Sequence, residues 1–173
     1  MVFGMLKPQD ILVLLKLVSI DNSEWSFNGL AVELGMSPSE VHAACNRALE
    51  AKLATKQSGK VVPLRQNLKS FIVNGLPFVF YPVRGELVRG MPTGHGAEPL
   101  ASLMTGDGEP VPVWPDPEGT ARGMSFKPLF KAVPKAAKRD PKLYELLVLV
   151  DAIRAGNARE RKLAIDLLEK ELG

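Results

Sequence analysis

Cysteine and histidine are scarce in this chain, and their scarcity excludes several kinds of site. The 173 residues contain one cysteine, Cys45, and two histidines, His42 and His95. A lone cysteine cannot form an internal disulfide, and two isolated histidines without a Cys/His spacing pattern do not form a metal-binding motif. We therefore expect no disulfide, no metal centre and no cofactor.

Long apolar runs and a strong net charge are also lacking. No apolar stretch approaches the ~18 residues of a membrane-spanning helix, and the N-terminus has neither the charged region nor the cleavage site of a signal peptide. The formal net charge is only +3, so contact with an anionic partner would need locally clustered cations. These features predict a soluble cytoplasmic protein without membrane contact.

Proline and glycine divide the chain into three parts. Ten of the 14 prolines lie between Pro77 and Pro134, which disfavours regular helices there, whereas the patterns on either side are helical. We predict an α+β protein. Its expected parts are a helical N-terminal domain with a hairpin over 1–76, an irregular Pro/Gly-rich segment with short strands over 77–139, and a helical hairpin over 140–173.

Apolar periodicity and capping signals predict three helices at the N-terminal end. Residues 8–18 have the apolar pattern of a first helix. Ser26 can cap a second helix that ends at Gly35, a residue free to adopt positive φ. Ser37 and Glu40 have the spacing of a capping box, so a third helix begins directly after this turn.

The third predicted helix has one apolar face and one short, polar face. Val41, Ala44 and Cys45 are expected to be buried, Cys45 as a small hydrophobic residue. Short side chains let a helix enter the major groove of DNA, where Ser and Asn can bond base edges and Arg can bond guanine or phosphate. The residues predicted to contact DNA here are Ser37, Ser39, His42, Ala43, Asn46 and Arg47.

A predicted hairpin follows this helix and carries clustered positive charge. Two extended runs, 53–57 and 60–64, flank Ser58-Gly59, which favours a two-residue turn. Between residues 47 and 69 there are six basic residues and one acid, Glu50, and such clustering favours contact with backbone phosphate. The residues predicted to bind DNA here are Lys56, Ser58, Lys60 and Arg65.

Residues 6–64 resemble the winged helix-turn-helix domain of MarR-like bacterial transcriptional regulators. The resemblance is carried by LAVELGMSPSEVHAACNRALEAKLA, residues 30–54, which match the family's Leu-Ala, Leu-Gly, Ser, Val and closing Leu positions. It implies a sequence-specific regulator that binds double-stranded DNA, a repressor of its own or a neighbouring operon. The family's long N-terminal dimerisation helix has no counterpart in residues 1–6, so we expect a homodimer built from the C-terminal end.

The middle segment offers little support for an enzyme. His95 could pair with Asp107 or Glu109 as acid and base, after an apolar run over 78–81 that is expected to be extended. This spacing matches no nucleophile elbow, phosphate loop or metalloprotease helix. We therefore do not expect catalysis.

Two pairs of residues are candidates for contact with a protein partner. Arg84 and Arg89 could meet phosphate or an acidic surface, or they could simply be solvated. Leu147 and Val150 lie on the apolar face of the predicted C-terminal hairpin, which either the middle segment or a second subunit must cover. The alternative to a regulator is therefore a partner of a neighbouring gene product, such as an antitoxin. A nucleotidyltransferase or nuclease gene beside this one would favour that alternative.

Overall fold

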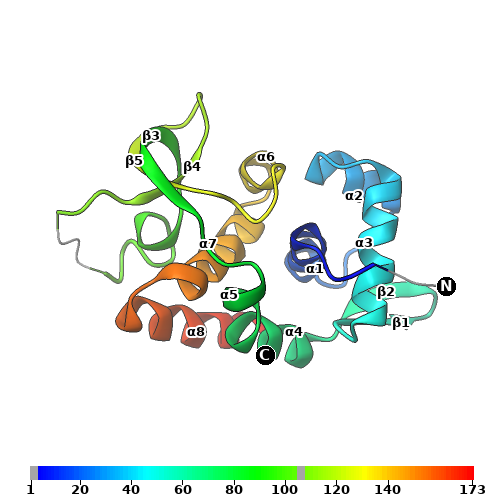
Figure 1. The fold of residues 1–173 in the computed structure, drawn as a ribbon. Helices are drawn as coiled ribbons and strands as arrows, with labels where there is room; N and C mark the ends of the chain where they lie inside the picture. Colours follow the sequence, from blue (N-terminus) through cyan, green and yellow to red (C-terminus); the bar gives the residue numbers. More distant parts are fainter. Residues whose placement is uncertain (1–3, 105–107) are drawn as a thin grey trace.

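The structure is a computed structural model that describes residues 4–104 and 108–173, and its fold is α+β, as predicted (Figure 1). The described part contains eight α-helices, a short 3-10 helix and five strands, and none of its helices is long and apolar enough to span a membrane. The predicted packing of two C-terminal helices against each other is confirmed. In chain order the elements are α1 (Pro8–Ile20), α2 (Phe27–Leu34), α3 (Pro38–Glu50), β1 (Ala54–Gln57), β2 (Lys60–Pro63), α4 (Arg65–Asn74), α5 (Leu76–Val79), β3 (Arg84–Pro92), η1 (Gly94–Gly96), β4 (Pro112–Pro115), β5 (Ala121–Phe126), α6 (Val133–Arg139), α7 (Pro141–Ala155) and α8 (Ala158–Leu172).

Local capping interactions start the helices where the sequence predicts them. The Ser26 hydroxyl accepts a hydrogen bond of 3.0 Å from the Gly29 amide at the start of α2, and α2 ends at Gly35, which has a φ of 66°. Ser37 and Glu40 form a reciprocal capping box at the start of α3, with donor–acceptor distances of 3.0 and 3.1 Å. The two helices are therefore joined by a tight turn that a left-handed glycine permits.

β1 and β2 form the predicted antiparallel hairpin. Gln57 pairs with Lys60, and the two turn residues between them, Ser58 and Gly59, have φ values of 50° and 78°. Positive φ at both positions matches the right-handed twist of the flanking strands. The two-residue turn is confirmed.

α1 is the central helix of the molecule. Every side chain from Ile11 to Val18 is buried, because α1 packs against α3 and β2 and also against α7, and Figure 1 shows it between these two parts of the chain. One hydrophobic cluster extends from Ile11 to Leu172. The three parts of the chain that differ in composition therefore share one hydrophobic core.

The middle segment is more regular than predicted. β3 is antiparallel to both β4 and β5, which are parallel to each other, so that each strand pairs with the other two. A Cβ at Gly90 would lie 2.1 Å from the carbonyl oxygen of Trp114, and a Cβ at Gly123 would lie 2.0 Å from that of Val111. The glycines that suggested irregular structure instead let three strands approach closely.

The sequence pattern also misses three helices, α4, α5 and α6. Residues 78–81 are not an extended run, because Phe78 and Val79 belong to α5, whose first residue, Leu76, is fully buried. Proline stands in the first turn of both α5 and α6, as Pro77 and Pro134. Proline is tolerated there because its missing N–H would have no partner inside the helix.

α7 is covered by the chain itself. Its residues from Leu146 to Arg154 are buried without interruption, since α1, α5, α6, α8 and η1 all pack against it. Leu147 is 1% and Val150 0% exposed. The expectation that these two residues form a partner-binding face is therefore corrected: both belong to the core.

A buried polar cluster joins α7 to the sheet. Asp151 accepts hydrogen bonds from the Thr93 hydroxyl (2.6 Å), the Trp114 indole (2.7 Å) and the Arg154 guanidinium (3.0 Å). Burial raises the pKa of Asp151, and these three donors oppose that shift by stabilising the carboxylate. Arg154 also donates to the Phe80 carbonyl at 2.9 Å, which ties the segment after α5 to the same cluster.

Asp140 connects the start of α7 to α1. Its carboxylate accepts hydrogen bonds from Lys16 (2.9 Å) and Ser19 (2.7 Å) and caps α7 through the Leu143 amide (3.1 Å). Burial by itself raises the pKa of Asp140, but these hydrogen bonds together lower it below its ordinary value. Asp140 is therefore both the N-cap of α7 and a polar link between α7 and α1.

Candidate nucleic-acid interface

α3 has the two faces that the sequence predicts. Val41, Ala44 and Cys45 are buried where α3 packs against α1 and α2. Burial raises the pKa of the Cys45 thiol to about 11, so this cysteine is not a reactive thiolate. On the opposite, open face, the exposed residues are Ser37, Ser39 and His42, and the half-buried ones are Ala43 and Asn46.

Two side chains of the open face hold each other in place. Asn46 and His42 lie one helical turn apart, with Asn46 Nδ2 3.2 Å from His42 Nδ1. The His42 ring also packs against Phe27 of α2, with ring centroids 5.0 Å apart. When Asn46 donates this hydrogen bond, His42 Nδ1 accepts it and the Nε2–H group remains a donor for a ligand. The open face therefore presents an amide and an imidazole in defined positions.

Arg47 does not belong to the open face. Its guanidinium makes two hydrogen bonds of 2.8 Å to Asp10 of α1, from Nε to Oδ2 and from Nη2 to Oδ1. The Asp10 side chain is 0% exposed and that of Arg47 13%. A buried carboxylate is unfavourable without such a partner. The prediction that Arg47 contacts DNA is therefore corrected, because its charge neutralises Asp10.

Arg65, the first residue of α4, is held by contacts with other parts of the chain. It donates to the Asp21 carboxylate at 2.8 Å and to the Glu171 carbonyl at 3.1 Å. Lys69, one helical turn further along α4, pairs with Glu169 of α8 at 3.6 Å. Both cations fasten α4 to its neighbours, and contact of Arg65 with DNA stays a prediction.

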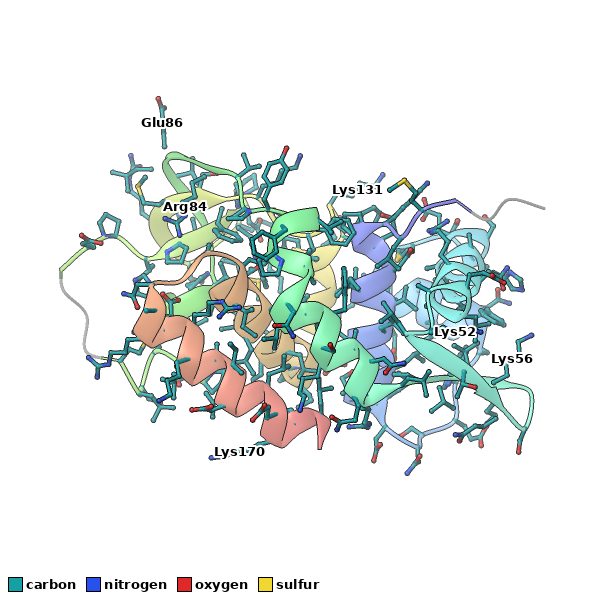
Figure 2. All side chains as sticks on the ribbon, turned by 60° about the horizontal axis from the view of Figure 1, so that its bottom comes forward. Lys52, Lys56, Arg84, Glu86, Lys131 and Lys170 are labelled. Carbon is teal, nitrogen blue, oxygen red and sulfur yellow. The ribbon has the colours of Figure 1, made fainter. Side chains whose placement is uncertain are left out.

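Three exposed lysines remain at the hairpin. Lys56 lies on β1, Lys60 on β2, and Lys52 in the connection between α3 and β1. Figure 2 shows Lys52 and Lys56 at the same end of the molecule. Lys60 pairs with Glu24, whose side chain is 87% exposed, and so exposed an ion pair is weak enough to exchange for a phosphate. Ser58 is exposed in the turn. Lys52 is not among the residues predicted to bind DNA, although it belongs to the cluster of basic residues between positions 47 and 69.

Arg84 and Arg89 lie on β3, away from this surface. Both are exposed. Arg84 donates a hydrogen bond of 2.5 Å to the Ala155 carbonyl, and Arg89 Nη1 lies 3.5 Å from the Gly119 carbonyl oxygen. Figure 2 shows Arg84 and Glu86 at the opposite end from Lys52 and Lys56. Contact of these arginines with a partner stays a prediction.

The segment from α5 to β3 exposes several large apolar side chains. Between residues 78 and 87, five of them are at least 47% exposed, namely Phe78, Val79, Tyr81, Val83 and Leu87. Single exposed apolar residues are common on soluble proteins, whereas a concentration of them marks contact surfaces. We call this set the apolar patch.

His95 has a different neighbour from the one considered in the sequence. Its Nδ1 lies 3.7 Å from Glu160 of α8, Glu109 is exposed, and Asp107 lies outside the described residues. In residues 4–104 and 108–173, no three His, Cys, Asp or Glu side chains form a group that could hold a metal ion.

Any functional interpretation of this surface rests on the side chains of the open face of α3 and of the hairpin lysines. Comparison of the chain with models of protein families, with curated proteins and with solved structures found no match.

Proposed function

We propose that the protein is a sequence-specific double-stranded DNA-binding regulator of transcription, in which α2 and α3 form a helix-turn-helix and β1–β2 is the wing. The observation that carries this proposal is the open face of α3, which presents short polar side chains beside exposed hairpin lysines. This combination suits the major groove for α3 and backbone phosphate for the hairpin. The MarR-like resemblance of residues 6–64 points the same way.

Each residue of the open face has a defined role in this proposal. The Asn46 amide can form the paired hydrogen bonds that distinguish adenine, and the Ala43 methyl can contact the methyl group of thymine. The His42 Nε2–H can donate to a base acceptor while Asn46 and Phe27 orient the ring. Arg47 acts indirectly, because its bond to Asp10 fixes α3 on α1.

Phosphate contacts supply the sequence-independent part of the binding. Lys52 and Lys56 have no ion-pair partner in the described part of the chain; Lys56 lies in the hairpin and Lys52 just before it. Each cation that neutralises a phosphate releases a counterion and steepens the salt dependence of binding by about 0.9 units. Lys60 can join them by leaving Glu24.

Selection of binding sites from a pool of random duplexes tests the proposal. The selected duplex is then used in fluorescence anisotropy at fixed salt with wild type, Asn46→Ala and Asn74→Ala, the last being a control at an exposed position of α4. Loss of the base contact should weaken binding of Asn46→Ala by about 1–3 kcal/mol, with no change for Asn74→Ala. A pool without an enriched sequence, or equal affinity for all three proteins, would reject sequence-specific binding through α3.

To test the regulatory part of the proposal, binding of the protein to DNA from upstream of its own gene is measured. Repressors of this kind read two-fold sites as homodimers, so the selected site should be palindromic and bind two protomers in sedimentation experiments. The dimer surface must lie outside Leu147 and Val150, which are core residues. A single protomer on a non-palindromic site would remove dimerisation from the proposal.

A second candidate function is binding of a protein partner, such as the product of a neighbouring gene. The apolar patch favours it, because Phe78 is 79% and Tyr81 67% exposed. Coexpression with that product should give a stable complex that Tyr81→Ser disrupts and Asn74→Ala does not. If the two proteins elute separately at micromolar concentrations, this candidate is rejected.

A further inference from the structure

A cavity of about 690 Å³ lies between the three-stranded sheet, η1 and the connection from α7 to α8. This end of the molecule is opposite to the β1–β2 hairpin (Figure 1). The volume falls within the range of small-molecule sites, which combine apolar walls with a few polar groups. Here the apolar wall includes Val111, Met124 and Phe126, and the polar groups include His95, Asn157 and Glu160.

Glu160 is the residue that points to a ligand. It is 6% exposed and lines the cavity. In the described part of the chain its carboxylate accepts no hydrogen bond, and its one ion-pair contact, His95 Nδ1, is 3.7 Å away. That separation exceeds hydrogen-bond distance. Its oxygens are accessible from the cavity, since no fully buried side-chain oxygen in the described residues lacks a partner, so a ligand with N–H groups can reach them.

The position of Glu160 in α8 does not account for its burial. It is the third residue of α8, and Asn157 caps this helix through the Glu160 amide at 2.9 Å. Glu40 occupies the same position in α3, but its carboxylate returns to the Ser37 amide in a capping box. The Glu160 carboxylate makes no such bond. Its side chain lines the cavity instead of completing the helix cap.

Two glycines leave the space that the Glu160 carboxylate occupies. A Cβ at Gly156 would lie 2.8 Å from Glu160 Cδ and 2.9 Å from Oε2, and one at Gly94 would lie 3.2 Å from Oε1. Side chains at these positions would crowd the carboxylate. The backbone requires glycine at both positions as well, because a Cβ at Gly156 would lie 2.5 Å from the Ala152 carbonyl oxygen and Gly94 has a φ of 54°.

The chemistry around Glu160 favours an organic cation over the alternatives. Asp151 also lines the cavity but already has three hydrogen-bond donors. A metal ion requires several ligands, and no suitable group of three side chains occurs in the described residues. Arg84, at the edge of the cavity, already donates to the Ala155 carbonyl. A ligand with N–H donors and positive charge would satisfy Glu160, and its apolar body would contact Val111 and Phe126.

We propose that this cavity binds a small organic cation, an amine or amidine with an apolar body, whose N–H groups donate to the Glu160 carboxylate. The inference does not rest on DNA binding, since the cavity and the open face of α3 share no residue. The site should bind a cation more tightly than a neutral molecule or an anion of the same shape.

Three probes of similar shape and different charge test this site in the full chain. Benzamidinium, benzamide and benzoate are titrated into isotope-labelled protein at one fixed pH, and the amide NMR signals are recorded. Benzamidinium should shift the signals of Gly94, His95 and Gly156. Benzamide should bind at least about tenfold more weakly, because charge-assisted hydrogen bonds are the stronger ones, and benzoate should not bind.

Variants on α8 locate the interaction. Glu160→Gln keeps the shape of the side chain and should lower benzamidinium affinity at least about tenfold, whereas Asp166→Asn, at an exposed position of the same helix, should not change it. Should Glu160→Gln fail to fold, the comparison of the three probes on wild type decides. Tighter binding of benzoate, equal binding of benzamide, no binding by benzamidinium, or binding that Glu160→Gln leaves unchanged would overturn the proposal.

Discussion

Replacing Arg47 with methionine tests whether this arginine stabilises the fold or binds DNA. The change leaves the Asp10 side chain, which is 0% exposed, with a single hydrogen bond, from the Lys7 amide at 2.8 Å. Removing one partner of a buried ion pair costs about 3–5 kcal/mol. The free energy of unfolding of a typical domain is only ~5–15 kcal/mol. We therefore expect Arg47→Met to lose a large fraction of its stability.

Urea unfolding followed by tryptophan fluorescence measures this loss, with Trp114 in the core as one reporter. The double variant Asp10→Asn/Arg47→Met is the matched control, because it removes the stranded charge together with its partner. It should be more stable than Arg47→Met alone, with a coupling energy of about 0.5–3 kcal/mol. An Arg47→Met protein that unfolds at the wild-type urea concentration but binds DNA more weakly would refute the structural role and return Arg47 to the interface.

Three further measurements probe the wing, the pH dependence and the core. Lys56→Ala should weaken binding to all DNA sequences alike and lower the salt slope by about one unit, while Lys170→Ala on α8, shown away from the hairpin in Figure 2, should leave the slope unchanged; a change in sequence preference instead would mean that the wing reads bases. The pKa of Asp140 is lower in the folded protein than in the unfolded chain, so its contribution is present above the unfolded value, ~3.9, and is lost as the pH falls through the folded-state pKa. Urea unfolding of Asp140→Asn should therefore show a weaker loss of stability on acidification than wild type, and parallel pH profiles would contradict this. Leu147→Glu places a charge at a position that is 1% exposed and should destabilise the fold by ~4 kcal/mol or more; a variant with wild-type circular dichroism that merely changes oligomeric state would show that Leu147 belongs to an interface.

The interactions that could be predicted from the sequence are those between residues a few positions apart. The Ser37–Glu40 capping box, the left-handed Gly35, the Ser58-Gly59 turn and the Asp140 N-cap each depend on backbone geometry within one turn. The two faces of α3 follow from the 3.6-residue helical period. These features were predictable because neighbours along the chain are neighbours in space whatever the rest of the protein does.

The partners of the long and charged side chains depend on tertiary contacts. Helical spacing places Arg47 near the open face of α3, but Asp10, 37 positions earlier, takes its guanidinium. In the same way, the core position of Leu147 required knowing that α1, α5 and α6 cover α7, and the buried Glu160 required the folded cavity. A side chain becomes buried when distant segments pack together, and a buried charge is unfavourable without a partner. No local sequence pattern specifies which segments will pack together.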